Sequence, residues 1–326
     1  MADTGTTDKA ASLAVTKNLL HTYGMLIILL LLFLGLSVSV DGFMSLRTVL
    51  SIMEQVSMFG IISIGVTFAI ITCGIDLSSG AVVALSAVVA AMVVSASDSV
   101  FAALVGFSAA IGVGALCGII NGSFTAIGKI PPFIATLGMM TIARGAAQLA
   151  SGGRPIDASS EAFTWIADIS VFGIPGLVII YIIVAVASHI LLSRSKFGRH
   201  VYAIGGNINA ARISGINVRR TLILVYTFAG SLAGLAGAML TARTYAGNPA
   251  YGNMWELDAI AAAVIGGTSL AGGVGSVPMC VIGALIIGTT NKGLNLLGVD
   301  PYWQQIVKGA IIILAVLLDT MKRRKT

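Results

Sequence analysis

Apolar residues form long, nearly uninterrupted runs along this chain, and charged residues gather at the ends of those runs. A helix that crosses a bilayer needs about 20 mostly apolar residues. Ten segments approach this length, so the pattern predicts an all-α integral membrane protein with about ten transmembrane helices. The predicted spans are Tyr23–Val40, Gln55–Thr72, Ser79–Ser95, Val100–Ile120, Phe133–Ser151, Ile174–Leu192, Thr221–Thr241, Trp255–Ala271, Val277–Thr290 and Trp303–Asp319.

Composition and charge placement support this interpretation. The chain is 57% hydrophobic and only 10% charged, whereas soluble domains carry about 25% charged residues. With a cytoplasmic N-terminus, the ten-span arrangement places 13 loop cations on the inner side and four on the outer side, as the positive-inside rule requires. Both termini are therefore predicted to be cytoplasmic. The net charge of +6 reflects these membrane-flanking loops, so we expect no nucleic-acid partner.

No polar block is long enough to form a separate domain. The sequence predicts a cytoplasmic N-terminal segment over residues 1–22, one transmembrane domain over 23–319 and a basic cytoplasmic tail over 320–326. Because no cleavage site follows a short apolar core, we expect no removable signal peptide. The three cysteines lack the spacing of metal ligands, and no metal site is predicted.

Small residues recur at every fourth position in two of the predicted spans. Such ridges let helix backbones approach closely in lipid, where attraction comes from packing. We therefore expect the two stripes to make helix contacts. They are Ala110, Gly114, Gly118 and Gly122 in one span, and Gly230, Gly234 and Ala238 in the other.

The segment between Glu54 and Asp98 is too long for one span and carries a single charge, Asp76. It is predicted to fold back near residues 73–80, where glycine permits a turn. In one interpretation, Asp76, Ser78 or Ser79 caps the following helix. In another, the turn lies at membrane depth and lines a cavity, where Asp76 could contact hydroxyl-bearing cargo.

A second break follows Asn121, where Pro131 and Pro132 remove two backbone donors and end any helix. The next predicted helix contains Arg144, and a cation inside a membrane needs a partner or a wet cavity. Arg144 could pair with Glu256 or Asp258, or it could contact cargo, and the sequence does not choose between these roles.

Two loops stand out. The predicted outer loop, residues 152–173, has a net charge of −2 and either docks a soluble partner or is simply solvated. The largest cytoplasmic loop is 193–220, in which Gly205 and Gly206 are expected to break the chain.

In that cytoplasmic loop, Asn207 is predicted to cap a helix of about two turns that Gly215 ends. Two turns are too few to be stable alone in water. Its small and apolar residues suit a protein groove, and Arg212 suits acidic or phosphate groups near the membrane.

These segments resemble the permease subunits of bacterial ABC importers for monosaccharides, with ribose and xylose systems as the nearest kin. The resemblance covers almost the whole chain. Ser79 stands where a larger apolar residue is expected, and Val274 where a basic residue is common. The motifs that carry the resemblance are Gly74 to Gly80, Pro132 to Gly138 with Arg144-Gly145, Gly206 to Ile216, Gly266 to Leu270 through Gly275, Asn291 to Leu297, and Trp303-Gln304.

The resemblance implies a pair of permease chains in the bacterial inner membrane, a cytoplasmic ATPase subunit and a periplasmic sugar-binding protein. It identifies 193–220 as the loop that couples to the ATPase. The coupling residues would be Gly205, Gly206, Asn207, Ala210, Ala211, Arg212, Ser214, Gly215 and Ile216. Candidates for the translocation path are Asp76, Ser78, Asn121, Phe133, Thr136 and Arg144.

The expected function is translocation of a monosaccharide delivered by the binding protein. The chain itself would not be an enzyme and would hold no cofactor, because ATP would be bound by the partner subunit. The only Gly-Lys pair is followed by Ile130, so no phosphate loop occurs. The alternative is a secondary transporter driven by an ion gradient, which broken helices and an isolated Asp76 would suit. The sequence does not identify the sugar.

Overall fold

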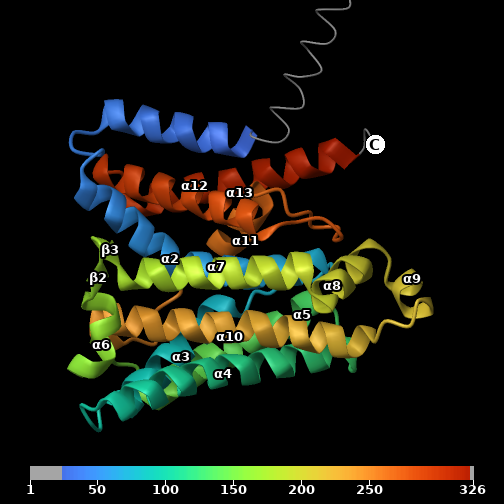
Figure 1. Ribbon diagram of the computed structural model, residues 1–326, viewed down its shortest axis with the longest axis horizontal. Coiled ribbons are helices and arrows are strands. Elements are labelled where there is room, and N and C mark those ends of the chain that lie inside the picture. Colours follow the sequence, from blue (N-terminus) through green and yellow to red (C-terminus); the bar gives the residue numbers. More distant parts are fainter. Residues whose placement is uncertain (1–23, 324–326) are drawn as a thin grey trace, which may run out of the picture.

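The computed structural model describes residues 24–323, which form a layered bundle of helices (Figure 1). After an initial helix, Gly24–Ser39, the helices are α2 (Leu46–Ile71), α3 (Ser79–Val94), α4 (Val100–Ala126), α5 (Pro132–Ser151), α6 (Glu161–Asp168), α7 (Gly176–Arg194), α8 (Lys196–Gly206), α9 (Ile208–Ile213), α10 (Val218–Thr244), α11 (Trp255–Ile265), α12 (Val277–Leu296) and α13 (Pro301–Arg323). The strands are β1 (Ile156–Asp157), β2 (Ser170–Val171), β3 (Ile174–Pro175) and β4 (Ala246–Gly247).

Each of the ten predicted spans overlaps one of these helices, and the all-α membrane fold is confirmed. Among the described residues, six helices are long and apolar enough to cross a membrane: α2, α4, α5, α7, α10 and α12. The initial helix and α3 are apolar but shorter, and α11 has only 11 residues. The number of crossings therefore stays a prediction. So does the division into domains, because residues 1–22 lie outside the described part.

Several predicted boundaries were wrong because a hydropathy pattern stops at a charge, whereas a helix continues through a paired one. The prediction began the second span at Gln55, but α2 begins at Leu46, where the Ser45 hydroxyl accepts from the Thr48 amide. Glu54 lies inside this helix and forms an ion pair with Arg243 of α10.

Other boundaries moved for local reasons. The prediction ended the eighth span at Ala271, but α11 ends at Ile265 because Gly267 adopts a left-handed conformation (φ +83°).

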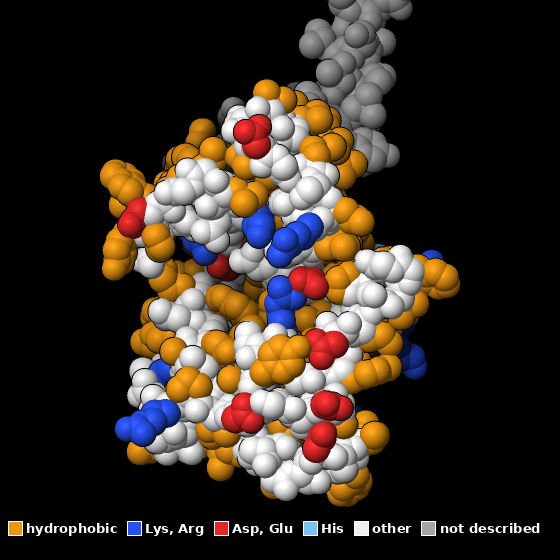
Figure 2. Space-filling view, turned by 90° about the vertical axis from the view of Figure 1, so that its left-hand side faces the viewer, with side chains coloured by type: hydrophobic (Ala, Val, Ile, Leu, Met, Phe, Trp, Pro, Cys, Tyr) orange, Lys and Arg blue, Asp and Glu red, His pale blue; other side chains and the backbone are white. Residues whose placement is uncertain are grey.

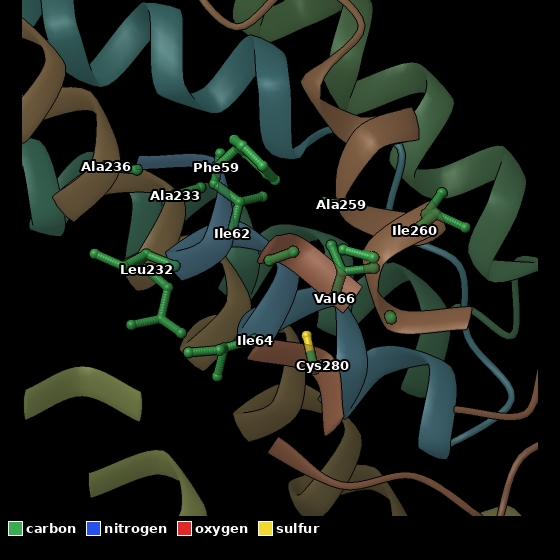
Figure 3. Packing of buried hydrophobic residues seen from close by; sticks show 14 of the residues in the cluster. Phe59, Ile62, Ile64, Val66, Leu232, Ala233, Ala236, Ala259, Ile260 and Cys280 are labelled. Atoms are coloured by element: carbon green, nitrogen blue, oxygen red, sulfur yellow. The ribbon is translucent and has the colours of Figure 1, made fainter. Parts of the chain in front are cut away.

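The hydrophobic core surrounds α2, which lies between α10 and α11 (Figure 3). Most residues of α2 from Val56 to Ile71 are fully buried. Figure 3 shows Phe59, Ile62, Ile64 and Val66 of α2 near Leu232, Ala233 and Ala236 of α10, Ala259 and Ile260 of α11, and Cys280 of α12.

The predicted small-residue stripes bring α4 and α10 into direct backbone contact. A methyl group at Gly114 would collide with the carbonyl oxygen of Gly230, and one at Gly118 would collide with that of Tyr226. In the reverse direction, Gly234 lies against the carbonyl of Ala110. The expected role of these stripes in helix contact is confirmed.

The two ends of the bundle carry different elements (Figure 1). One end holds α8, α9 and the end of α13. The opposite end holds α6 and the β2–β3 hairpin. Figure 1 thus places the end of α13 on the same side as the loop 193–220.

Candidate functional site

The break between α2 and α3 is held by hydrogen bonds within a few residues. One carboxylate oxygen of Asp76 accepts from the Ser78 amide (2.9 Å) and the Ser78 hydroxyl (2.6 Å). Ser78 occupies the N-cap position of α3, but its side chain makes no capping bond there. Asp76 therefore stabilises the turn before the helix and does not cap the first turn of α3.

Four candidate path residues meet at this break, and we call Asp76, Ser78, Asn121 and Thr136 the Asp76 cluster. The Asn121 amide of α4 donates to the Ser78 hydroxyl (2.9 Å), and the Thr136 hydroxyl of α5 donates to the carbonyl of Ile75 (3.0 Å). All four side chains are buried. Within residues 24–323, the Asn121 carbonyl oxygen and the Ser79 hydroxyl beside the cluster have no hydrogen-bond partner. These buried polar atoms are free to form hydrogen bonds with a small polar molecule.

Phe133 and Arg144 point elsewhere. The Phe133 side chain is 49% exposed on α5. The Arg144 guanidinium donates to the carbonyl oxygens of Pro249 (2.6 Å) and Tyr251 (2.7 Å), in the segment that leads into α11. Of the two acids considered as its partners, Asp258 instead binds Lys308. Arg144 thus fixes a non-helical segment by hydrogen bonds to its backbone.

The loop 193–220 contains two helices, whereas the sequence predicted one. Gly205 and Gly206 do not break the chain, because they form the last residues of α8. The Ser195 hydroxyl accepts from the Gly198 amide (3.0 Å) and caps this helix. Phe197, Val201 and Ile204 supply its apolar face. That cap and that spacing were the available signals for α8.

The second helix, α9, has the predicted cap and end. The Asn207 side-chain oxygen accepts from the amides of Asn209 and Ala210, both at 3.0 Å. Gly215 follows the helix with a φ of +80°, and the Ile216 amide donates to the Ala211 carbonyl (3.1 Å). The short helix is thereby closed at both ends.

One residue of α9 that was expected to contact a partner is buried instead. Ala211 is buried against Ile204 and Val218, so it attaches α9 to the rest of the chain and is not available to a partner's groove. Ile208 (41% exposed) and Ile213 (88% exposed) point outward with Arg212. The surface that a partner can reach is therefore Ile208, Ala210, Arg212, Ile213 and Ser214.

The end of α8 contacts both breaks of the bundle, and we call Ile71, Tyr202, Gly205, Gly273 and Gly275 the α8 junction. A methyl group at Gly205 would collide with the Ile71 carbonyl, since the two backbones touch. The Gly273 amide donates to that same carbonyl (2.9 Å). The Tyr202 hydroxyl donates to the Gly275 carbonyl (2.7 Å). One helix thus links the α2–α3 break to the α11–α12 break, a connection that sequence reasoning missed.

The predicted outer loop has a structure of its own. β1 pairs with β4, and the Phe163 ring of α6 packs on Phe107 of α4 with ring centres 4.7 Å apart. Asp98 accepts from the Ser160 hydroxyl (2.7 Å) and the Ala162 amide (3.2 Å). These hydrogen bonds, the Ser160 one foremost, hold the pKa of the Asp98 carboxyl below its ordinary value. Figure 2 looks onto this end and shows acidic side chains gathered on its lower half, where α6 lies.

Comparison with known proteins assigns the family. Residues 48–316 match the family described as "Branched-chain amino acid transport system / permease component". The chain is 44% identical to the ribose import permease protein RbsC of Bacillus subtilis (strain 168), over 90% of this chain and 91% of that protein.

Two further relatives have similar coverage. The D-allose transport system permease protein AlsC of Escherichia coli (strain K12) is 42% identical over 87% of each chain. The xylose transport system permease protein XylH of Haemophilus influenzae is 37% identical over 94% of this chain and 98% of that protein. No solved structure matches the chain. With most of its length matched both by the family and by these relatives, the chain belongs to this family of transport-system permease components.

Proposed function

We propose that this chain is the translocation subunit of an ATP-driven importer in the bacterial inner membrane and that its cargo is a monosaccharide. The names of the ribose, D-allose and xylose relatives support the class of cargo. The structural observation that carries the proposal is the chain of contacts from exposed α9 through the α8 junction to both breaks. A displacement of α9 would reach the Asp76 cluster through the break that Asp76 itself holds.

The proposed partners fit the two ends of the bundle. A cytoplasmic ATPase subunit would bind the exposed face of α9 and would hold the ATP, so this chain needs no cofactor. A periplasmic sugar-binding protein would dock on the acidic end around α6. A second copy of the chain would complete the permease, and hydrolysis would occur on the ATPase alone.

The proposed topology has ten spans, with both termini and α9 in the cytoplasm. Support comes from the position of the end of α13 on the same side as α9 (Figure 1) and from the cations of α8 and α9 at that end. Topology reporters fused at Ala10, Ser159, Asn207 and Thr326 should report inside, outside, inside and inside. A periplasmic signal at Asn207 would contradict both the topology and the coupling role.

The energy source separates this proposal from an ion-driven porter. Uptake into vesicles should require ATP and the ATPase partner and should persist when the proton gradient is collapsed. Asp76→Asn should keep most of the uptake, because an amide oxygen can accept the same two bonds from Ser78. Transport that vanishes with the gradient at constant ATP would overturn the importer proposal.

A further inference from the structure

A cavity of about 170 Å³ lies between the first turn of α11 and the first half of α13. This volume is close to that of a cavity of about 150 Å³ that accepts benzene, so a single six-membered ring fits. The lining segment follows β4, which pairs with β1 of the outer loop. Gly252, next to the lining residue Asn253, touches the backbone of Gly80 in the first turn of α3, so the cavity lies near the α2–α3 break.

The polar groups of this cavity are arranged by depth. Asp258 is buried (6% exposed), and its carboxylate binds the Lys308 ammonium at 3.0 Å. The side chains of Asn253 and Gln305 are exposed on the same lining. An ion pair therefore lies deep in the cavity, with amides nearer its mouth.

The chemistry of this lining matches a polyhydroxylated ring. A carboxylate accepts hydrogen bonds, an ammonium donates them and amides do both, as a set of neighbouring hydroxyls requires. Leu257 and Ile312 add an apolar wall for the C–H face of a sugar. Charges inside a membrane protein are costly and usually mark a solute path.

Gly309 keeps the cavity open. No atom lies within 4 Å of where its β-carbon would be, and its φ is not in the left-handed region. Because Gly309 is itself a lining residue, a larger side chain at this position would add bulk at the cavity without backbone strain, and it would leave Asp258 and Lys308 in place.

We propose that this cavity is a transit subsite for the monosaccharide, with Asp258, Lys308, Asn253 and Gln305 as its hydrogen-bonding groups. This inference rests on the proposed function. A sugar would occupy the cavity during its passage through the permease.

Filling the cavity tests the subsite directly. The complete importer, in proteoliposomes with ATP, is assayed for uptake of radiolabelled D-ribose, D-xylose and D-allose, and the sugar that the wild type imports is carried forward. Gly309→Leu should lower the maximal uptake rate by about tenfold or more, since one misplaced methylene in a fitted pocket is worth 10–200-fold. Gly309→Ala should have a smaller effect. Assembly of each variant with its partners is checked by size-exclusion chromatography.

Gly112→Leu is the matched control, because Gly112 is also helical with open space at its β-carbon but lies on α4. It should import at the wild-type rate. An assembled Gly309→Leu importer with the wild-type rate would overturn the subsite and leave the proposed function standing. If the wild type imports none of the three sugars, the proposed function fails first.

The ion pair gives a second measurement. Asp258→Asn combined with Lys308→Gln keeps hydrogen-bonding groups but removes both charges. A subsite predicts a lower uptake rate and an altered order of preference among the three sugars. A pair that only joins α11 to α13 predicts a lower melting temperature with an unchanged order of preference, and that result would count against the subsite.

Discussion

The two ends of this bundle present different surfaces to a partner. At the α6 end, short strands pair and Phe163 is enclosed against Phe107, while acidic groups face solvent around the exposed rings of Trp165 and Phe172. At the α9 end, Ile213 is almost fully bare on a two-turn helix.

This difference indicates two kinds of interface. A bare isoleucine on a short helix is tolerable where a partner stays bound, because apolar contact dominates lasting interfaces. An end where acidic groups surround a few exposed aromatic rings suits a soluble protein that docks and leaves, because charge steers encounter more than it adds affinity. The predictions below test this contrast, from the largest expected effect to the smallest.

The largest effect is expected at Ile213. Ile213→Glu places a charge in the apolar contact with the ATPase subunit, and the affinity of that contact should fall about tenfold or more, as at interface hot spots. Co-purification of the two subunits measures it. The same change at the other end, Val171→Glu, should leave ATPase association unchanged. Normal association of the Ile213 variant would show that α9 is not the coupling element.

A smaller effect is expected at the acidic end. Glu161 is exposed in the first turn of α6, and Glu161→Lys should weaken docking of the sugar-binding protein about three- to tenfold at low salt. Because exposed charges are screened, the effect should shrink at about 0.5 M salt. Surface plasmon resonance with the reconstituted importer would measure both. Equal weakening at both salt concentrations would argue against electrostatic steering.

The α8 junction should show a moderate effect on coupling. Tyr202→Phe removes the hydroxyl that donates to Gly275, a bond worth about 1 kcal/mol, and leaves the α9 surface intact. The ratio of sugar imported to ATP hydrolysed should fall about two- to fivefold, while ATPase binding is unchanged. Tyr245→Phe is the matched control, because its hydroxyl donates to Asp168 at the other end. An unchanged ratio for Tyr202→Phe would remove the junction from the coupling route.

The smallest effect concerns pH at the α6 end. Because hydrogen bonds lower the pKa of Asp98 below its ordinary value of 3.8 in the folded protein, the carboxylate stabilises the fold above that value. The contribution is lost as pH falls through the lower folded value. Asp98→Ala should lower the melting temperature by about 1 °C at neutral pH, and the gap to wild type should narrow progressively on acidification below pH 3.8. A gap that widens on acidification would contradict this assignment.

Local features of this fold were readable from the sequence. The cap at Asn207 and the end at Gly215 lie within a few residues of the helix that they close, and short-range geometry fixes them. The helix contact made by the stripe containing Gly114 and Gly118 could also be predicted, because small residues at every fourth position have few other uses in a membrane helix. The Asp76 turn also depends on a residue only two positions away.

Distant pairings were not readable. Glu54 and Arg243 are 189 residues apart, so each was interpreted as a mark of a span's end, and the α2 boundary moved as a result. The outer loop had no pattern to detect, since strands of two residues leave no alternation. Tyr202 joined the site only because the fold brings it to Gly275. The candidate path residues were chosen individually, and the structure decided which four of them meet.

The contact between α4 and α10 has a mechanical consequence. At Gly114, Gly118, Gly230 and Gly234 backbone rests on backbone, with no side chain between the two helices that could change rotamer. Sliding of one helix along the other would force main-chain atoms into each other, and an interface without rotamers offers no second arrangement to settle into. These two helices should therefore move as one rigid beam, and any alternation of openings must be taken up by helices that touch through side chains.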